Sequence, residues 1–239
     1  MTQIGDDARS KQSSRIAFSA LCVIAFVVFT SLGIWQIQRR AWKLDLIAAI
    51  DSRIHASATD APGPQSWPQL SAEHDAYRHV RIEGAFLGTP PVLVQAVTEL
   101  GPGYWVMSPL HAARGFTILI NRGFVAQDDK DRVAPPPTDA TVTGLLRMTE
   151  PGGGFLRKND PDAGRWYSRD VAAIAKVMNV PDAAPYFVDA DTALSGPGQP
   201  FGGLTVVNLP NNHLVYVITW FALAAMAAAA WVKVMRNKA

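Results

Sequence analysis

The chain has 239 residues, of which 49% are hydrophobic and 18% are charged, and its formal net charge at pH 7 is +2. This balance excludes an intrinsically disordered chain, which would be poorer in apolar residues and richer in charge. Residues 39–212 carry 16 basic and 18 acidic side chains, so the basic excess lies at the chain ends and no nucleic-acid-binding face is indicated.

The first predicted element is a membrane-spanning helix over residues 16–38. These 23 residues contain no charged side chain and lie between Arg15 and Arg39. About 20 apolar residues are enough to cross a bilayer. A cleaved signal peptide is the alternative, but the apolar run is too long for one and no small-x-small cleavage site precedes Arg39. We expect the helix to continue over 42–54 as an amphipathic helix.

Residues 39–212 predict a soluble domain built mostly of strands. Apolar and polar side chains alternate over 78–86, which is the period of a half-buried strand. The proline- and glycine-rich stretches at 61–68, 134–137, 151–154 and 195–203 are expected to be loops. One helix is predicted over 171–179, with Asp170 as its N-cap and Pro181 as its stop. The further strand candidates are 91–97, 103–110, 115–125, 141–147, 185–190 and 203–208.

A second membrane span is predicted over 213–232. It contains 19 consecutive uncharged residues, 214–232, and its alanine-rich second half suits close helix packing in lipid. The chain then divides into a cytoplasmic arm (1–15), a first span (16–38), a periplasmic domain (39–212), a second span (213–232) and a cytoplasmic tail (233–239). The predicted fold class is an α+β membrane protein, in which two transmembrane helices flank a mainly antiparallel, β-rich sheet or open barrel.

The orientation follows from the basic residues at the chain ends. The tail carries Lys233, Arg236 and Lys238, whereas 177–212 carries no Lys or Arg. The positive-inside rule therefore places both termini in the cytoplasm. The N-terminal arm contains Asp6 and Asp7, unlike an acid-poor mitochondrial presequence. We predict a multi-pass protein of the bacterial inner membrane, with its central domain in the periplasm.

The sequence predicts no enzyme. It contains no nucleophile elbow, zinc-binding H-E-x-x-H helix or phosphate-binding loop. A single cysteine, Cys22, rules out an internal disulfide and a cysteine-based metal cluster. We interpret Cys22 as a small apolar packing residue, His74 and His79 as surface residues, and His111 as part of a hairpin turn.

One group of residues at the outer ends of the two spans stands apart. His213 begins the second span after Asn211 and Asn212, and Tyr216 and Trp220 follow it on the same helix face. Near the exit of the first span lie Gly33, Trp35, Gln36 and Arg39. Two interpretations remain open, an ordinary interfacial belt of aromatic and polar residues, or a site for an amphiphilic ring such as haem. In the second case His213 is the axial ligand, Asn211 or Asn212 supplies the hydrogen bond that holds its imidazole, and Arg39 and Arg40 face the propionates.

Six segments then carry a resemblance to a known family. They are Leu32-Gly33-x-Trp35-Gln36-x-x-Arg39-x-x-Trp42-Lys43, Tyr77-x-x-Val80-x-x-x-Gly84-x-Phe86, Gly103-Tyr104-x-Val106-x-x-Pro109-Leu110, Ile120-Asn121-Arg122-Gly123-Phe124-Val125, Val142-x-Gly144-Leu145-Leu146-Arg147 and Asn211-Asn212-His213-Leu214-x-Tyr216-x-x-Thr219-Trp220-Phe221. Each is weakly specific alone, but their order along nearly the whole chain resembles the surfeit locus protein 1 family of cytochrome c oxidase assembly factors.

The resemblance implies a role in assembling an aa3-type oxidase. In that reading the chain receives haem a as transient cargo and helps to insert it into oxidase subunit I, with haem a synthase as a further partner. His213 is then the metal ligand, and Trp220, Tyr216, Trp35, Gly33, Gln36 and Arg39 are the cofactor-binding residues. The alternative is a structural scaffold for subunit I that does not bind haem. For Arg122 we expect an ion pair with an acidic side chain, with docking or a propionate contact as alternatives.

Overall fold

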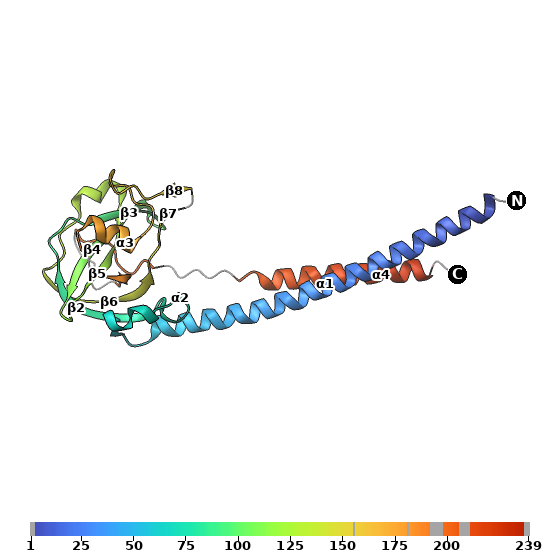
Figure 1. The fold of residues 1–239 in the computed structure, drawn as a ribbon, viewed down its shortest axis with the longest axis horizontal. Coiled ribbons are helices and arrows are strands. Elements are labelled where there is room, and N and C mark those ends of the chain that lie inside the picture. The colour runs from blue at the N-terminus through green and yellow to red at the C-terminus, as the bar shows by residue number, and fades with distance from the viewer. Residues whose placement is uncertain (1–2, 155, 181, 192–197, 206–210, 237–239) are drawn as a thin grey trace. The chain divides into compact units, whose positions relative to one another are not determined.

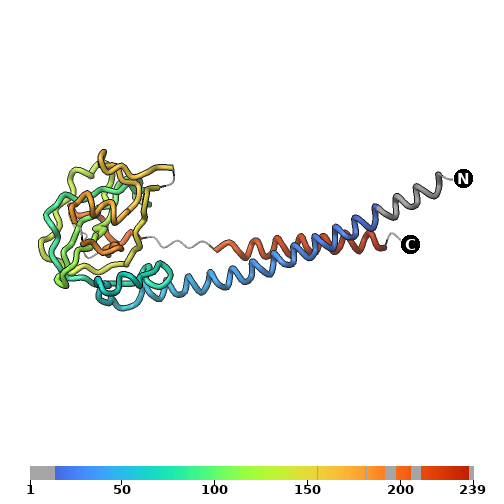
Figure 2. The backbone as a smooth tube through the Cα atoms, in the orientation of Figure 1, coloured from blue at the N-terminus to red at the C-terminus, as the bar shows by residue number. Residues whose placement is uncertain are grey.

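The computed structural model describes residues 3–154, 156–180, 182–191, 198–205 and 211–236, with side chains from Ser14 onwards. The backbone forms two compact units (Figures 1 and 2). One contains 1–48 and 208–239, and the other contains 49–207. The first is called the helical unit below, and the second is called the domain.

The helical unit contains two long apolar helices, as the sequence predicts. They are α1 (Gln3–His55) and α4 (His213–Arg236). Within them, Ser14–His55 and His213–Arg236 are long and apolar enough to cross a membrane, with peak mean hydropathies of 2.4 and 1.9. Most of their large apolar side chains are exposed, whereas Cys22 and Ala224 are buried. The expected continuation of the first helix over 42–54 is also confirmed, because α1 runs unbroken to His55.

The domain is mostly strand, with short helices between the strands. In chain order its elements are β1 (Thr59–Asp60), the 3₁₀ helix η1 (Pro64–Gln69), α2 (Ala72–Asp75), β2 (His79–Phe86), β3 (Val92–Thr98), β4 (Gly101–Ala112), β5 (Thr117–Ala126), the 3₁₀ helix η2 (Gln127–Arg132), β6 (Asp139–Met148), β7 (Gly153–Gly154), β8 (Arg157–Lys158), α3 (Val171–Val177) and β9 (Ala183–Ala190). Asp170 caps α3 as predicted, because its carboxylate accepts a hydrogen bond from the Ala173 N–H.

The main sheet closes on itself. Its strand order is β1-β2-β6-β9-β5-β4-β3, and β2 also pairs with β4 through Gly84↔Ala112, Ala85↔His111 and Phe86↔Leu110. Five strands, β2, β6, β9, β5 and β4, therefore form a ring, which makes the barrel more closed than the expected sheet or open barrel. The pairs β1–β2 and β5–β9 are parallel and the remaining pairs are antiparallel, so the mainly antiparallel prediction is confirmed.

The parallel pair β5–β9 is buried on both faces. Ile118 and Ile120 join a core inside the ring, whereas the intervening Leu119 joins a second core under α3. Phe187 of β9 and Ile174 of α3 complete that second layer. Burying each such side chain contributes roughly 1.5–3 kcal/mol, and a strand covered on both faces reads as a continuous apolar run.

Four sequence predictions in the domain differ from the structure. Residues 203–205 form no strand, and the remainder of the predicted strand 203–208 lies outside the described residues. His111 lies within β4 and not in a hairpin turn, and its Nδ1 is 3.2 Å from the Thr117 hydroxyl. The predicted loop 61–68 contains η1, and the predicted loop 151–154 contributes β7.

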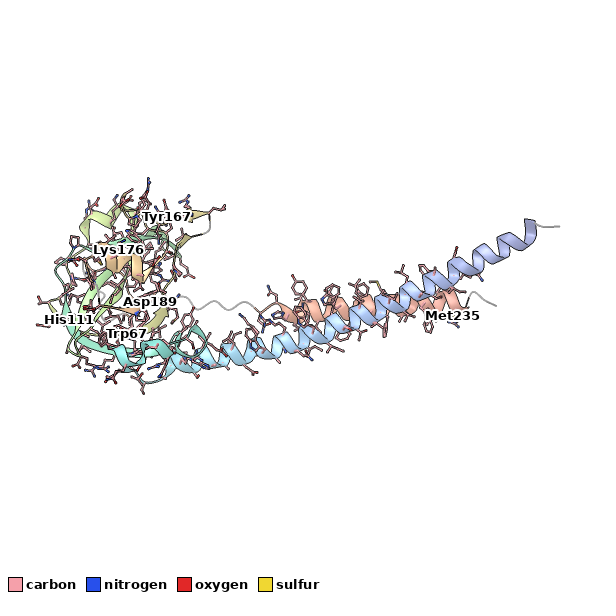
Figure 3. The ribbon with its side chains drawn as sticks, viewed as in Figure 1. Trp67, His111, Tyr167, Lys176, Asp189 and Met235 are labelled. Carbon is pink, nitrogen blue, oxygen red and sulfur yellow. The ribbon has the colours of Figure 1, made fainter. Side chains whose placement is uncertain are left out.

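The polar centre of the domain is Asp189, whose side chain is only 3% exposed (Figure 3). One carboxylate oxygen accepts hydrogen bonds from Asn121 Nδ2 (2.8 Å) and Arg169 Nη1 (3.0 Å). The other accepts from Arg147 Nη1 (2.7 Å) and Thr205 Oγ1 (3.0 Å). These contacts join β5, β6, β9 and the segment before α3 around one buried charge.

Glu150 balances the second positive charge of this centre. Arg169 Nη2 lies 2.5 Å from one Glu150 oxygen, and Arg147 Nη2 lies 3.7 Å from the same oxygen. Burial alone would raise the pKa of the Glu150 carboxyl, but the hydrogen bonds and charge of Arg169, with the charge of Arg147, outweigh it and lower the pKa. Two guanidinium groups therefore face two carboxylates, and the cluster is neutral.

Candidate functional site

His213 is the first residue of α4, as the Asn-Asn-His sequence predicts. The Val215 N–H donates to the carbonyl oxygen of Asn212 at 3.2 Å, which places Asn212 at the start of the helix. The His213 side chain is half-buried, and its Nδ1 lies 2.7 Å from Gln36 Oε1 of α1. An amide oxygen only accepts, so this contact is a hydrogen bond when Nδ1 is the protonated nitrogen, and in that neutral tautomer the lone pair is on Nε2.

The partner of the imidazole differs from the one expected. The sequence suggests that Asn211 or Asn212 holds the ring, but the imidazole lies against Gln36 Oε1 of the other helix, which accepts the hydrogen bond. Gln36 is itself buried, at 9% exposure. Metal-ligating histidines commonly use this arrangement, in which one ring N–H donates to an oxygen and the other nitrogen stays available.

Gly33 lies one turn before Gln36 and lets the two helices approach. A Cβ at this position would lie 2.9 Å from the Phe221 ring of α4, closer than such atoms come in proteins. The Phe221 ring of the second helix fills the space beside Gly33 in this structure. The close contact helps to bring Gln36 and His213 within hydrogen-bond distance.

Trp220 lies further along α4 than His213, towards the C-terminal end of this helix. Seven residues separate them, a rise of about 10 Å along a helix. Its indole stacks on Phe29 of α1 with ring centroids 5.8 Å apart and an angle of 26° between planes. Trp220 Nε1 and Asn211 Oδ1 are buried without a hydrogen-bond partner among the described residues. Buried polar atoms without partners are unusual, and each calls for an explanation such as a water, an ion or a functional role.

The other predicted site residues are more exposed. Tyr216 and Trp35 are about half exposed, and no interaction recorded among the described residues links either of them to His213. The Arg39 guanidinium lies 3.9 Å from the centre of the Trp42 ring on its own helix. The structure therefore joins His213 directly to Gln36, and it joins Gly33 and Trp220 to the same helix interface through Phe221 and Phe29.

Phe29 and Phe221 are absent from the predicted site, although the sequence contains a pattern that includes Phe29. Cys22, Phe29 and Gln36 recur at intervals of seven residues on α1, and His213 and Trp220 show the same interval on α4. Repeats of seven place side chains on one seam between two helices. The seven-residue period therefore identifies Phe29 from the sequence. It does not identify Phe221, which follows Trp220 by one residue and packs on Gly33.

The chemistry of this arrangement is that of a single imidazole ligand. Among the residues described, no three His, Cys, Asp or Glu side chains come together to hold a bare metal ion. An iron bound at His213 would therefore need most of its ligands from a ring such as porphyrin. An imidazole whose Nδ1 is held by a buried amide oxygen fits such a group.

Arg122 lies in the domain, in the Asn121-Arg122-Gly123 segment. Among the described residues it does not form the ion pair that the sequence analysis predicts for it. Its Nη2 donates to the Ala134 carbonyl and to Gln199 Oε1, both at 2.6 Å. Its Nη1 is buried without a partner, and no Asp or Glu pairs with it in the described ranges. Burial lowers the pKa of the Arg122 guanidinium to about 10, because water no longer stabilises its charge.

Comparison with known proteins supports one family. The SURF1 family model matches residues 23–225. Surfeit locus protein 1 of Mus musculus is 34% identical over 223 residues, covering 84% of this chain and 70% of the mouse protein. The Homo sapiens protein of that name is 33% identical over 226 residues, covering 84% and 72%. A SURF1-like protein of Caenorhabditis elegans is 30% identical over 259 residues, covering 98% and 79%. The chain belongs to the SURF1 family, whose members are generally known as cytochrome c oxidase assembly factors.

Proposed function

We propose that this chain is a membrane-anchored assembly factor that holds haem a at His213 and helps to insert it into subunit I of an aa3-type cytochrome c oxidase. The observation that carries the proposal is the 2.7 Å contact between His213 Nδ1 and Gln36 Oε1. It orients the imidazole and leaves Nε2 free as an iron ligand. Family membership supports the oxidase as the destination.

The proposed placement is the bacterial inner membrane, with α1 and α4 as spans. The exposed apolar side chains of both helices would face lipid. Basic residues at both chain ends favour termini in the cytoplasm and a domain in the periplasm. His213 then lies at the periplasmic interface, where a haem can keep its tail in lipid and turn its propionates towards water.

The residues of the site suit a cargo that must leave again. A single protein ligand holds iron less firmly than a pair of ligands in a closed pocket would. Gln36 orients the imidazole from α1, while Arg39 and Arg40 supply positive charge for propionates. No covalent step is needed, so the proposed role is non-enzymatic. The scaffold alternative also has support, since Phe221 and Phe29 close the helix interface without any cofactor.

Absorption spectra of the full chain, purified from cells that make haem a, test the proposal. We expect the wild-type protein to carry haem and His213→Ala to lose most of it while reaching the membrane at a normal level. Gln36→Ala should bind haem about 10–100-fold more weakly, the usual effect of removing such a supporting hydrogen bond. His111→Ala, in the domain, is the matched control and should bind normally. Unchanged haem and spectrum in His213→Ala would favour the scaffold alternative.

A further inference from the structure

Two hairpin ends of the domain expose large apolar side chains to solvent. Leu156 is 89% exposed in the β7–β8 hairpin, and Val97 and Leu100 are 84% and 54% exposed at the turn between β3 and β4. Only two other large apolar side chains of the described domain, Val177 and Phe201, are exposed. The domain otherwise buries such side chains, so a cluster of three calls for an explanation.

The two hairpin ends lie next to each other. Ala96 and Val97 of β3 line one cleft of about 340 Å³ together with Gly154 and Arg157 of the β7–β8 hairpin. Figure 1 shows this hairpin extending from the body of the domain close to β3. The two hairpin ends therefore border the same cleft. Their exposed apolar residues, Val97, Leu100 and Leu156, are called the tip surface below.

The residues of the turn at Leu156 are not those that two-residue hairpin turns prefer. Gly153 pairs with Lys158 and Gly154 with Arg157, so residues 155 and 156 connect the strands. Two-residue hairpin turns favour glycine, asparagine or aspartate, because they need positive φ. Here the sequence is Phe155-Leu156; Phe155 lies outside the described residues, and Leu156 has a φ of +60°. Leu156 is therefore both exposed and held in a conformation that leucine rarely adopts.

The charges beside the tip surface indicate the chemistry of that contact. Arg157 and Lys158 follow Leu156 directly and are exposed, and the Arg157 guanidinium lies 5.5 Å from the centre of the Tyr167 ring. Glu99 is the one acidic residue within the β3–β4 turn. Apolar side chains that enter the acyl boundary, beside basic side chains that meet phosphate, are typical of segments that bind anionic bilayers at their surface.

We propose that the tip surface docks the domain on an anionic phospholipid bilayer. Val97, Leu100 and Leu156 enter the headgroup region, and Arg157 and Lys158 bind lipid phosphates. The proposal goes beyond haem delivery; it rests on the proposed placement of α1 and α4 in a membrane but not on haem binding. Covalent attachment to two membrane spans would give the tip surface a high effective concentration at the bilayer, so a weak contact is sufficient.

A fluorophore at the tip tests this in the full chain. The single native cysteine is replaced by Cys22→Ala, and Leu156→Cys is labelled with an environment-sensitive dye. The protein is reconstituted in vesicles of phosphatidylcholine and phosphatidylglycerol. We expect blue-shifted emission, at least twofold stronger quenching by spin-labelled acyl chains than at a control site, and protection from iodide.

The matched control is Ala113→Cys, which is exposed at the turn at the other end of β4. Figure 3 shows His111, near that turn, and Tyr167, near the tip surface, on opposite sides of the domain. With the dye at Val97→Cys, the pair Arg157→Glu and Lys158→Glu should lower acyl-chain quenching at least twofold in these vesicles.

Two results would overturn the proposal. Equal quenching at positions 156 and 113 would place the tip surface in water. Protection of position 156 that develops only after adding oxidase subunit I would make it a protein-docking surface. The haem content of the same preparation is read independently, so failure here is distinguishable from failure of the haem proposal.

Discussion

Replacement of Asp189 by asparagine should destabilise the domain strongly. Asp189→Asn keeps the shape of the side chain but removes the negative charge that Arg147 and Arg169 share. Glu150 alone would then face two guanidinium groups, and the amide nitrogen of the new side chain would point at one of the donors. The side chains of Asp189, Arg169 and Arg147 are only 3%, 10% and 18% exposed, so water can compensate little.

The expected loss of unfolding free energy is about 3–5 kcal/mol, the usual result of removing one partner from a buried ion pair. The two charged hydrogen bonds from arginine, at roughly 1.5–3 kcal/mol each, give a similar sum. Domains of this kind unfold with about 5–15 kcal/mol in total, so a substantial part of the stability is lost. With a urea dependence of roughly 2 kcal/mol per molar, the midpoint should fall by about 2 M.

Pulse proteolysis of the full chain in detergent, across a urea series, measures this midpoint through cleavage of the unfolded domain. Asp160→Asn is the matched control, because it removes a carboxylate from a solvent-exposed pair with Arg165. That variant should keep a midpoint close to wild type. If Asp189→Asn shifts the midpoint no more than Asp160→Asn does, the buried network does not hold the barrel together. Adding Arg147→Met to Asp189→Asn should recover part of the loss, since it restores charge balance with Glu150.

Three further outcomes follow from the structure. Gly33→Leu should separate the two helices by clashing with the Phe221 ring and lower haem binding in absorption spectra; Gly88→Leu, where no atom lies within 4 Å of an added Cβ, should leave binding unchanged. Burial raises the pKa of Glu150, but the neighbouring guanidinium groups outweigh burial and hold this pKa below its ordinary value of 4.5. The ionised Glu150 carboxylate therefore stabilises the fold above pH 4.5, and this stability is lost as the pH falls through the lower pKa of the folded state. Wild type should lose more stability on acidification than Glu150→Gln in the same urea assay. A periplasm-active reporter inserted near Gly152 should be active and one at the C-terminus silent, and the reverse pattern would contradict the proposed orientation.

Local patterns in the sequence predict most of the secondary structure. The alternation over 78–86 corresponds to β2, and the charge-free runs correspond to the apolar segments of α1 and α4. Asp170 marks the start of α3 correctly. These features depend on side chains within a few residues of one another, so periodicity and capping preferences are enough to find them. The failure over 203–205 has the same origin, because a short apolar run does not show whether a neighbouring strand is available to pair with it.

The pairing of distant residues follows from packing instead. Gln36 and His213 are 177 positions apart, and they meet because Gly33 admits the Phe221 ring between the helices. No local pattern in the sequence predicts that the imidazole of His213 pairs with Gln36 instead of the adjacent Asn212. Arg122 similarly reads as half of an ion pair in the sequence, but the fold directs it to a carbonyl and an amide oxygen. A chain's local pattern sets which groups must be buried, whereas the three-dimensional packing of distant segments sets which partners they find there.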